Sequence, residues 1–223
     1  MIVAGQDTAL QAVSLCAAAL THRYGRRVAL EPLEFELTTP GVVAITGPNG
    51  SGKSTLLRII AGLLRPTGGA LAFALQGEAI APIERRHCVG LATPELAFYE
   101  EFTGRENLAF VAESRGISQS AQRIASTLEC VQLEPRADDR VADYSSGMKQ
   151  RLRLAFAILH RPPVLLLDEP GAHLDVEGRK VVERIVQSES SRSLILLATN
   201  DPEEMHLATK RIELNGRGLG GPS

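Results

Sequence analysis

The chain has 223 residues and a mass of 24.0 kDa, with 44% hydrophobic and 22% charged residues. These proportions exclude a disordered chain, and the length predicts one large domain or one domain with an added subdomain. The net charge is −2, Trp is absent and aromatic residues make up 4%. We therefore expect no nucleic-acid partner, because such proteins need a basic surface and exposed rings.

The three cysteines do not have the spacing of a metal site. Cys16, Cys88 and Cys130 are widely separated and odd in number, so we interpret them as small apolar side chains in a reducing compartment. No apolar run approaches the roughly 18 residues of a membrane helix. The run from Ala12 to Leu20 could be mistaken for a signal-peptide core, but no basic residue precedes it, which favours a first β-strand.

The chain is predicted to begin with strands. Leu33, Phe35 and Leu37 alternate with glutamates, a pattern typical of a strand with one buried face. A later run is short, apolar and rich in β-branched residues, which suits a strand buried on both faces. The predicted order is a loose start over 1–9, a strand at 13–20, a turn at 21–25, and strands at 33–37 and 42–46.

A Gly-rich loop and a helix from Lys53 to Leu64 follow the third strand, and residues 66–69 are expected to end this unit. The middle of the chain, from about Leu96 to His160, has helical patterns. Its predicted features are a capping box at Thr103 and Glu106, a second helix capped by Ser118, and a third helix over 148–160.

The last quarter of the chain is predicted to alternate strands and a helix. Apolar runs of four or five residues favour buried strands, and a longer mixed segment favours a helix between them. Asn215 and Gly216 indicate a turn, and we expect the Gly-rich tail over 216–223 to be disordered. The predicted elements are a strand at 164–167, a helix at 177–188, and strands at 194–198 and 211–214.

Residues 47–54 fit the phosphate-loop pattern G-x-x-x-x-G-K-[ST]. Glycines allow successive backbone N–H groups to surround a phosphate, and the following helix adds its positive end. Lys53 is expected to reach the β- and γ-phosphates, and Ser54 to offer its hydroxyl to Mg²⁺. The loop therefore predicts a bound nucleotide and Mg²⁺, and the resemblance described below implies that the nucleotide is ATP. The expected nucleotide contacts are Gly47, Pro48, Asn49, Gly50, Ser51, Gly52, Lys53, Ser54 and Thr55.

A second acidic motif follows the apolar run at 164–167. Asp168 is expected to emerge at the carboxyl end of that strand, where ligands bind in such sheets, and to hold Mg²⁺. Glu169 is placed to orient or deprotonate an attacking water. This motif alone is weak, but downstream of a phosphate loop it indicates nucleotide hydrolysis.

The segment Tyr144-Ser145-Ser146-Gly147-Met148-Lys149-Gln150-Arg151 resembles the signature motif of ATP-binding-cassette (ABC) ATPases. The order of phosphate loop, signature and acidic strand is also similar to that family, from about Leu15 to Leu214. The resemblance implies that Tyr24 stacks on adenine, that Asp175 belongs to the D-loop, and that Asn200 occupies the switch-histidine position. It also implies that residues 145–148 bind ATP held by a partner.

The resemblance implies a fold as well: an α/β P-loop NTPase core of the ABC type with an N-terminal antiparallel β-subdomain and an inserted helical subdomain. We expect a single domain over 1–223. Its core would comprise about 10–94 and 161–215, and its helical subdomain about 95–160.

Two such domains in the family meet head to tail around two ATP molecules, and hydrolysis loosens them. The resemblance therefore implies a second ABC ATPase chain as partner, a homodimer rather than a heterodimer, and separate transmembrane transporter subunits. We expect an exporter ATPase subunit that is cytoplasmic and peripheral on the inner face of the membrane. The segment over 197–204 and the short length are similar to the haem-exporter-type ATPase of cytochrome c maturation, and drug, lipid or polysaccharide exporters of the same type are the alternatives.

Three residues depart from the family pattern. Ser146 replaces a signature glycine, Glu95 stands where a Q-loop glutamine is usual and could reach Mg²⁺, and Asn200 cannot carry a proton. They leave open an alternative function, a nucleotide-gated regulatory module with weak hydrolysis that acts as the degenerate half of a heterodimer. A further alternative is that Asn200 only caps a turn and that His206 is the switch residue.

The segment from Glu95 to Glu106 is the predicted coupling surface to the membrane subunits. We expect Phe98, Tyr99 and Phe102 to face outward there, since three aromatic residues in five are a large share of the nine in the chain. The alternative is that these rings pack inside the helical subdomain.

Overall fold

The structure is a computed structural model that describes residues 11–215. The loose start predicted over 1–9 and the disordered tail predicted over 216–223 lie outside the described residues. The strands are β1 (Val13–Tyr24), β2 (Arg27–Thr38), β3 (Gly41–Thr46), β4 (Gly68–Leu75), β5 (Glu78–Ala79), β6 (Val89–Ala92), β7 (Val164–Asp168), β8 (Leu194–Ala198) and β9 (Lys210–Glu213). The α-helices are α1 (Lys53–Ile60), α2 (Gly104–Ser114), α3 (Ser120–Cys130), α4 (Ser146–Ile158), α5 (Val176–Glu189) and α6 (Pro202–Met205), and the short 3-10 helices are η1 (Pro82–His87), η2 (Glu134–Arg136) and η3 (Val141–Asp143).

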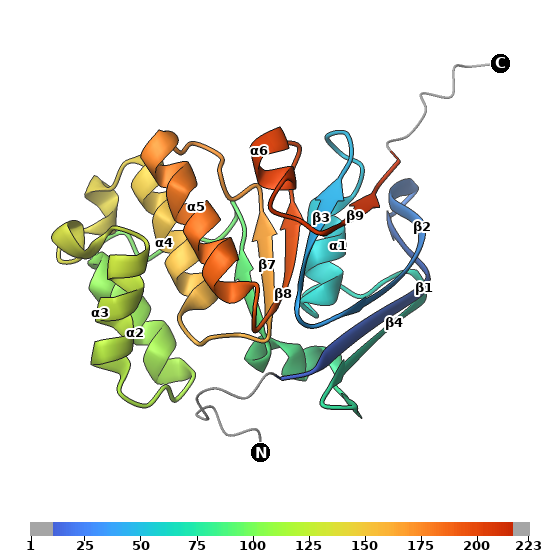
Figure 1. The fold of residues 1–223 in the computed structure, drawn as a ribbon, viewed down its shortest axis with the longest axis horizontal. Coiled ribbons are helices and arrows are strands. Elements are labelled where there is room, and N and C mark those ends of the chain that lie inside the picture. The colour runs from blue at the N-terminus through green and yellow to red at the C-terminus, as the bar shows by residue number, and fades with distance from the viewer. Residues whose placement is uncertain (1–10, 216–223) are drawn as a thin grey trace.

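Two sheets organise the described residues. A parallel sheet has the strand order β6-β7-β8-β3-β9, and an antiparallel sheet has the order β2-β1-β4-β5. Figure 1 shows the parallel sheet in the middle of the molecule, with α2 and α3 at one end and the antiparallel sheet at the other. This arrangement agrees with the predicted α/β core, antiparallel β-subdomain and helical subdomain.

The inner strands of the parallel sheet, β3, β7 and β8, are buried on both faces, as the apolar runs predicted. All five residues of β7 and all five of β8 are buried. Along β7, Leu165 and Leu167 join a core shared with α2, α3, α4 and α5, whereas Val164 and Leu166 join a core shared with α1 and the antiparallel sheet. Each strand thus contributes alternate side chains to two cores, and its carboxyl end is held in place from both sides.

The first strand is longer than predicted. The prediction placed a turn over 21–25, but β1 continues to Tyr24 because register shifts let its ladder with β2 resume after each irregularity. Ala19 has a φ of 46° within this stretch, and His22 is buried with its Nδ1 3.0 Å from the Arg65 carbonyl oxygen. Tyr24 therefore lies on a strand end rather than in a loose loop.

Several elements were missed or misplaced by sequence patterns. The prediction missed β4, which begins where the preceding unit was expected to end. Its Gly- and Ala-rich sequence is a poor strand signal, and the strand forms because it pairs with β1. α1 stops at Ile60 rather than Leu64, since Gly62 has a φ of +77° and lies against the Pro82 carbonyl. The short β6 and α6 carried no periodic signal.

The helical region confirms one predicted cap and contradicts another. Thr103 caps α2, its hydroxyl accepts from the Glu106 N–H at 3.1 Å, and the Glu106 carboxylate accepts from the Thr103 N–H at 2.8 Å. The prediction that Ser118 caps α3 is wrong. Gln119 occupies that place in a left-handed conformation, with a φ of 53° and no side-chain cap.

Candidate nucleotide site

The phosphate loop joins β3 to α1 and requires its glycines. Gly47 has a φ of +145°, and a Cβ atom there would lie 2.3 Å from the Leu214 carbonyl oxygen. Gly52 has a φ of +104°, and a Cβ atom there would lie 2.3 Å from the Ala29 carbonyl oxygen. Because side chains clash at both positions, the loop can close around a ligand only with glycine there.

The amino end of α1 is open to an anion. Gly52 is its N-cap and offers no side-chain acceptor, so the first N–H groups of the helix are free to bind a phosphate. Lys53 is buried, and its ammonium group donates to the carbonyl oxygens of Gly47 at 2.7 Å and Pro48 at 3.4 Å. These contacts hold the lysine inside the loop, where a phosphate would meet it.

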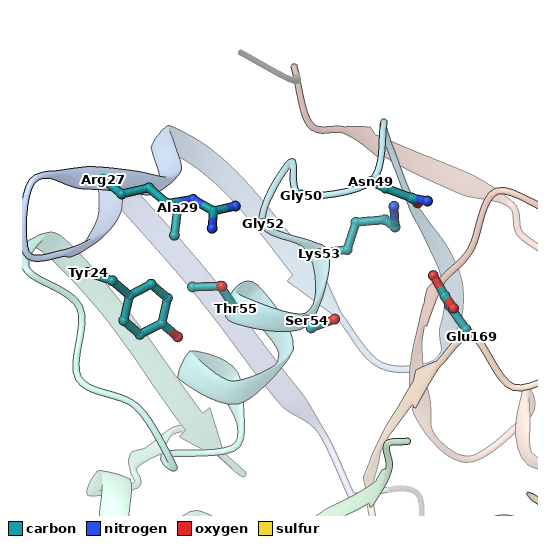
Figure 2. Close-up of a pocket in the computed structure, with 10 residues that line it drawn as sticks. All are labelled: Tyr24, Arg27, Ala29, Asn49, Gly50, Gly52, Lys53, Ser54, Thr55 and Glu169. Carbon is teal, nitrogen blue, oxygen red and sulfur yellow. The ribbon is translucent and has the colours of Figure 1, made fainter. Parts of the chain in front are cut away.

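A cavity of about 270 Å³ lies over the loop. It extends from Tyr24 at one end to Glu169 at the other, with Lys53 between them, as Figure 2 shows. Of the residues predicted to contact the nucleotide, Gly47, Pro48 and Ser51 do not line it, although the first two bind Lys53. The lining consists of Tyr24, Arg27, Ala29, Asn49, Gly50, Gly52, Lys53, Ser54, Thr55 and Glu169.

Asp168 and Ser54 lie together as predicted. Asp168 is buried at the end of β7 and accepts a hydrogen bond from the Ser54 hydroxyl. Burial raises the pKa of the Asp168 carboxyl, and the Ser54 hydrogen bond opposes this shift. A hydroxyl and a carboxylate are oxygen ligands that Mg²⁺ prefers, and phosphate oxygens and waters would complete its shell.

Glu95 lies away from the cavity lining. Its carboxylate pairs with the Arg58 guanidinium and accepts a hydrogen bond from the Thr93 hydroxyl. The Thr93 hydrogen bond lowers the pKa of Glu95, and a backbone hydrogen bond and the Arg58 charge act in the same direction. A role for Glu95 at the metal stays a prediction, because Arg58 occupies the carboxylate in this structure.

Glu169 stands at the junction of two cavities. It lines the nucleotide cavity and also a second cavity of about 300 Å³, and Asn49 is the other residue common to both. Its φ of 47° turns the chain at the end of β7, and the side chain is exposed. Glu169 thus presents a carboxylate to both cavities.

Asn200 lines the second cavity with Glu169. Its side-chain oxygen accepts a hydrogen bond from the Gly47 N–H at 3.3 Å, which links the end of β8 to the phosphate loop. His206, the alternative switch residue, is exposed at the end of α6 and lines neither cavity. The geometry therefore favours Asn200 over His206 at this position.

Three polar residues for which the sequence predicted no individual role hold the site together. Glu204 is buried and accepts from the Gly171 N–H at 2.7 Å, and burial raises its pKa. The buried Gln150 donates to the Pro170 carbonyl oxygen at 3.0 Å. Arg179 forms an ion pair with Asp201 beside the second cavity. Gln150 lies in the signature segment, but its contact, like those of Glu204 and Arg179, joins residues distant in sequence, which no motif predicts.

The signature and D-loop residues lie outside the nucleotide cavity of their own chain. Ser145 caps α4, and its hydroxyl accepts from the Met148 N–H at 3.2 Å. Asp175 caps α5 and accepts from the Gly178 N–H at 2.8 Å. The two caps are neighbours, since a Cβ atom on Gly147 would lie 3.3 Å from the His173 carbonyl oxygen. Ser145 and Ser146 are exposed.

The sequence pattern that defines the ABC transporter family matches residues 30–172. The chain belongs to the ABC transporter family. Within that family it is an ATPase domain, with the phosphate loop, acidic strand and signature described above.

Curated relatives include ATP-binding proteins of both export and import systems. The uncharacterized ABC transporter ATP-binding protein YxlF of Bacillus subtilis is 38% identical, over 81% of this chain and 60% of that protein. The Nod factor export ATP-binding protein I of Burkholderia orbicola is 36% identical, over 85% of this chain and 64% of that protein. The sulfate/thiosulfate import ATP-binding protein CysA of Nephroselmis olivacea is 34% identical, over 88% of this chain and 58% of that protein. The chain thus spans about three fifths of these relatives' length.

Solved structures agree with the fold. An ATP-binding subunit of an ABC transporter superposes with a TM-score of 0.78 at 28% identity, covering 90% of this chain and 85% of that one. The ATP-binding cassette MJ0796, in a dimeric post-hydrolysis state with ADP and Pi, superposes with a TM-score of 0.79 at 23% identity, covering 90% and 94%. Over residues 11–215, no helix is long and apolar enough to cross a membrane.

Proposed function

We propose that this chain powers a membrane exporter by ATP-driven head-to-tail pairing with a second copy of itself. The observation that carries the proposal is the separation between the signature and the nucleotide cavity. Ser145 and Ser146 are exposed at the start of α4 and do not line the cavity that holds Lys53. A second copy would bring its own α4 to this cavity and complete the phosphate site.

The start of α4 has the chemistry that such a contact needs. Ser145 fixes the first turn through Met148, and the amino end of the helix carries a partial positive charge. No acidic side chain occupies the first turn of α4. This end is therefore complementary to a γ-phosphate bound on the other copy, and the two copies would be joined by ATP.

Hydrolysis would use residues already in place. Bound Mg²⁺ would neutralise charge on the β- and γ-phosphates, held by Ser54 and Asp168. Lys53 would bind the same phosphates, and Glu169 would orient the attacking water and take its proton. Asn200 would position the phosphate loop through Gly47 and face the γ-phosphate from the second cavity.

A cluster of exposed rings supports docking of a membrane subunit. Tyr99 and Phe102 are 52% and 49% exposed, and Phe110 of α2 is 55% exposed. The Tyr99 ring lies 5.7 Å from Phe102 and 5.5 Å from Phe110, centroid to centroid. The prediction that Phe98 also faces outward is wrong, because its half-buried ring packs against the core and lies 5.3 Å from the Phe156 ring, centroid to centroid. The remaining three rings form an apolar patch of the kind that binds partners.

Export and a place on the inner membrane face belong to this proposal. The Nod factor export protein, 36% identical, supports export, whereas the sulfate/thiosulfate import protein, 34% identical, would support the opposite direction. We favour export on the resemblance of the sequence to small exporter ATPases, including those of haem export.

A second candidate function rests on Asn200. Its amide oxygen accepts from the Gly47 N–H, and an amide supplies no positive charge as the transition state gains negative charge. The chain would then be a nucleotide-gated module with weak hydrolysis, paired with a more active chain. Glu169 favours the exporter ATPase, because the carboxylate that a hydrolytic site needs is present and reaches both cavities.

The experiment that tests the proposal is size-exclusion chromatography of the Glu169→Gln variant with MgATP, MgADP and no nucleotide. ATP should still bind while hydrolysis loses its base, which costs about 10²- to 10⁴-fold in rate. We expect a dimer in MgATP and a monomer in the other two conditions. The double variant Glu169→Gln, Lys53→Ala is the control and should stay monomeric. A Glu169→Gln monomer that binds MgATP tightly would contradict the homodimer.

A further inference from the structure

Arg27 is a cation of the nucleotide cavity that no motif identifies. It is the first residue of β2, and it pairs with Tyr24, the last residue of β1, across a two-residue turn. Side chains of directly opposite residues in an antiparallel pair project from the same face of the sheet. Arg27 and Tyr24 therefore enter the cavity side by side, and both line it.

The Arg27 guanidinium extends over the phosphate loop. A Cβ atom built on Gly50 would lie 3.6 Å from its Nη2 atom. In Figure 2 the side chain reaches from the β1–β2 hairpin toward Gly50 and Gly52, on the Tyr24 side of Lys53. A side chain at position 50 would therefore be in van der Waals contact with this guanidinium.

The guanidinium has no hydrogen bond or ion pair within residues 11–215. Other arginines of the same region are paired, for example Arg58 with Glu95 and Arg179 with Asp201. Lys53 is also engaged, through the carbonyl oxygens of Gly47 and Pro48. Arg27 is thus a free, planar donor group beside a helix amino end, in a position that suits a phosphate.

We propose that Arg27 binds the α-phosphate of the nucleotide. This inference rests on the nucleotide site described above. Tyr24 marks the adenine end of the cavity, and Lys53 marks the β- and γ-phosphates. Arg27 enters from the Tyr24 side and ends short of Lys53, so the phosphate within its reach is the one next to the ribose. Two parallel N–H groups of the guanidinium would each donate to an α-phosphate oxygen.

The placement has a consequence for selectivity. ATP and ADP carry the same α-phosphate, so Arg27 strengthens the binding of both nucleotides by the same factor. It therefore raises the affinity for the product as well as for the substrate, and slows ADP release. A residue at the γ-phosphate would favour ATP over ADP instead.

Isothermal titration calorimetry of MgATP and MgADP with the Arg27→Gln variant tests the proposal. Glutamine keeps part of the apolar stem and removes the charge. We expect about a tenfold loss of affinity for each nucleotide, with their affinity ratio unchanged. The wild type should also lose affinity with salt more steeply than the variant. Arg26→Gln, in the adjacent turn position, is the matched control and should bind both nucleotides as the wild type does.

Three results would overturn the proposal. These are unchanged affinities in Arg27→Gln, a loss for MgATP alone, and an equal loss in Arg26→Gln, which would mean a general effect of charge. Equal melting temperatures of wild type and variant establish that the fold is intact. Failure of the nucleotide site itself is distinguishable, because the wild type would then bind neither nucleotide.

Discussion

The exchange Asn200→His tests whether the site lacks a positive charge. In the structure, the Asn200 oxygen accepts one neutral hydrogen bond from the Gly47 N–H at 3.3 Å, which is longer than the usual N–H···O distance of about 2.7–3.2 Å. Such a bond contributes about 0.5–1.5 kcal/mol. A histidine would lose that acceptor contact but would donate to the γ-phosphate, and charge-assisted hydrogen bonds are about twice as strong as neutral ones.

We therefore expect slow turnover by the wild type, below the ~1–10³ s⁻¹ typical of enzymes. Asn200→His should accelerate it about tenfold, equivalent to about 1.4 kcal/mol of barrier. The gain should shrink as the pH rises above the histidine pKa, normally about 6.5, because neutral imidazole supplies no charge.

The assay is steady-state ATP hydrolysis by the wild type, Asn200→His and Asn200→Ala between about pH 6 and pH 9. His206→Ala is the matched control, since His206 is exposed and lines neither cavity. Equal rates for the wild type and both Asn200 variants would refute the reasoning. Loss of activity in His206→Ala alone would move the switch residue to α6.

Two further predictions concern a buried histidine and the exposed rings. Burial, followed by the Arg115 charge, lowers the pKa of His160 to about 3, so between about pH 6.5 and pH 3 the unfolded chain binds a proton that the native chain does not. This group should therefore lower the free energy of unfolding by about 1.4 kcal/mol for each pH unit of decrease. Denaturant titrations of His160→Gln should lack that pH dependence, whereas those of His206→Gln, a change at an exposed histidine, should keep it. For the rings, Tyr99→Ser with Phe102→Ser should abolish stimulation of ATP hydrolysis by the membrane subunits and leave basal hydrolysis and melting temperature unchanged; loss of folding would show that the rings serve the core.

Much of the site follows from sequence because its chemistry is local. The phosphate loop needs glycines, a lysine and a hydroxyl in one short run, and Lys53, Ser54 and Glu169 line the cavity as expected. The position of Asp168 is predictable for the same reason, because the four apolar residues before it form a buried strand that ends at Asp168. The buried strands and the Thr103 cap also depend on neighbouring residues alone.

What escaped prediction depends on contacts between distant segments. β4 exists because it pairs with β1, and its own residues are poor strand formers. Glu204 is an ordinary helix residue in sequence, and its role arises from the Gly171 N–H. Gln150 belongs to the signature segment, but its bond to the Pro170 carbonyl oxygen could not be read from that motif. Arg27 belongs to the same class, because only the β1–β2 pairing brings it over Gly50.

Calorimetric titration of the wild type and Lys53→Ala with MgATP tests the central claim most directly. Lys53 is the cation inside the phosphate loop, and one charge pair at such a site is worth several kcal/mol at an effective dielectric constant of about 20. The wild type is predicted to bind MgATP with one site per chain. Lys53→Ala is predicted to show no tight binding while melting as a folded protein. Equal MgATP affinity in the two proteins would contradict the nucleotide site.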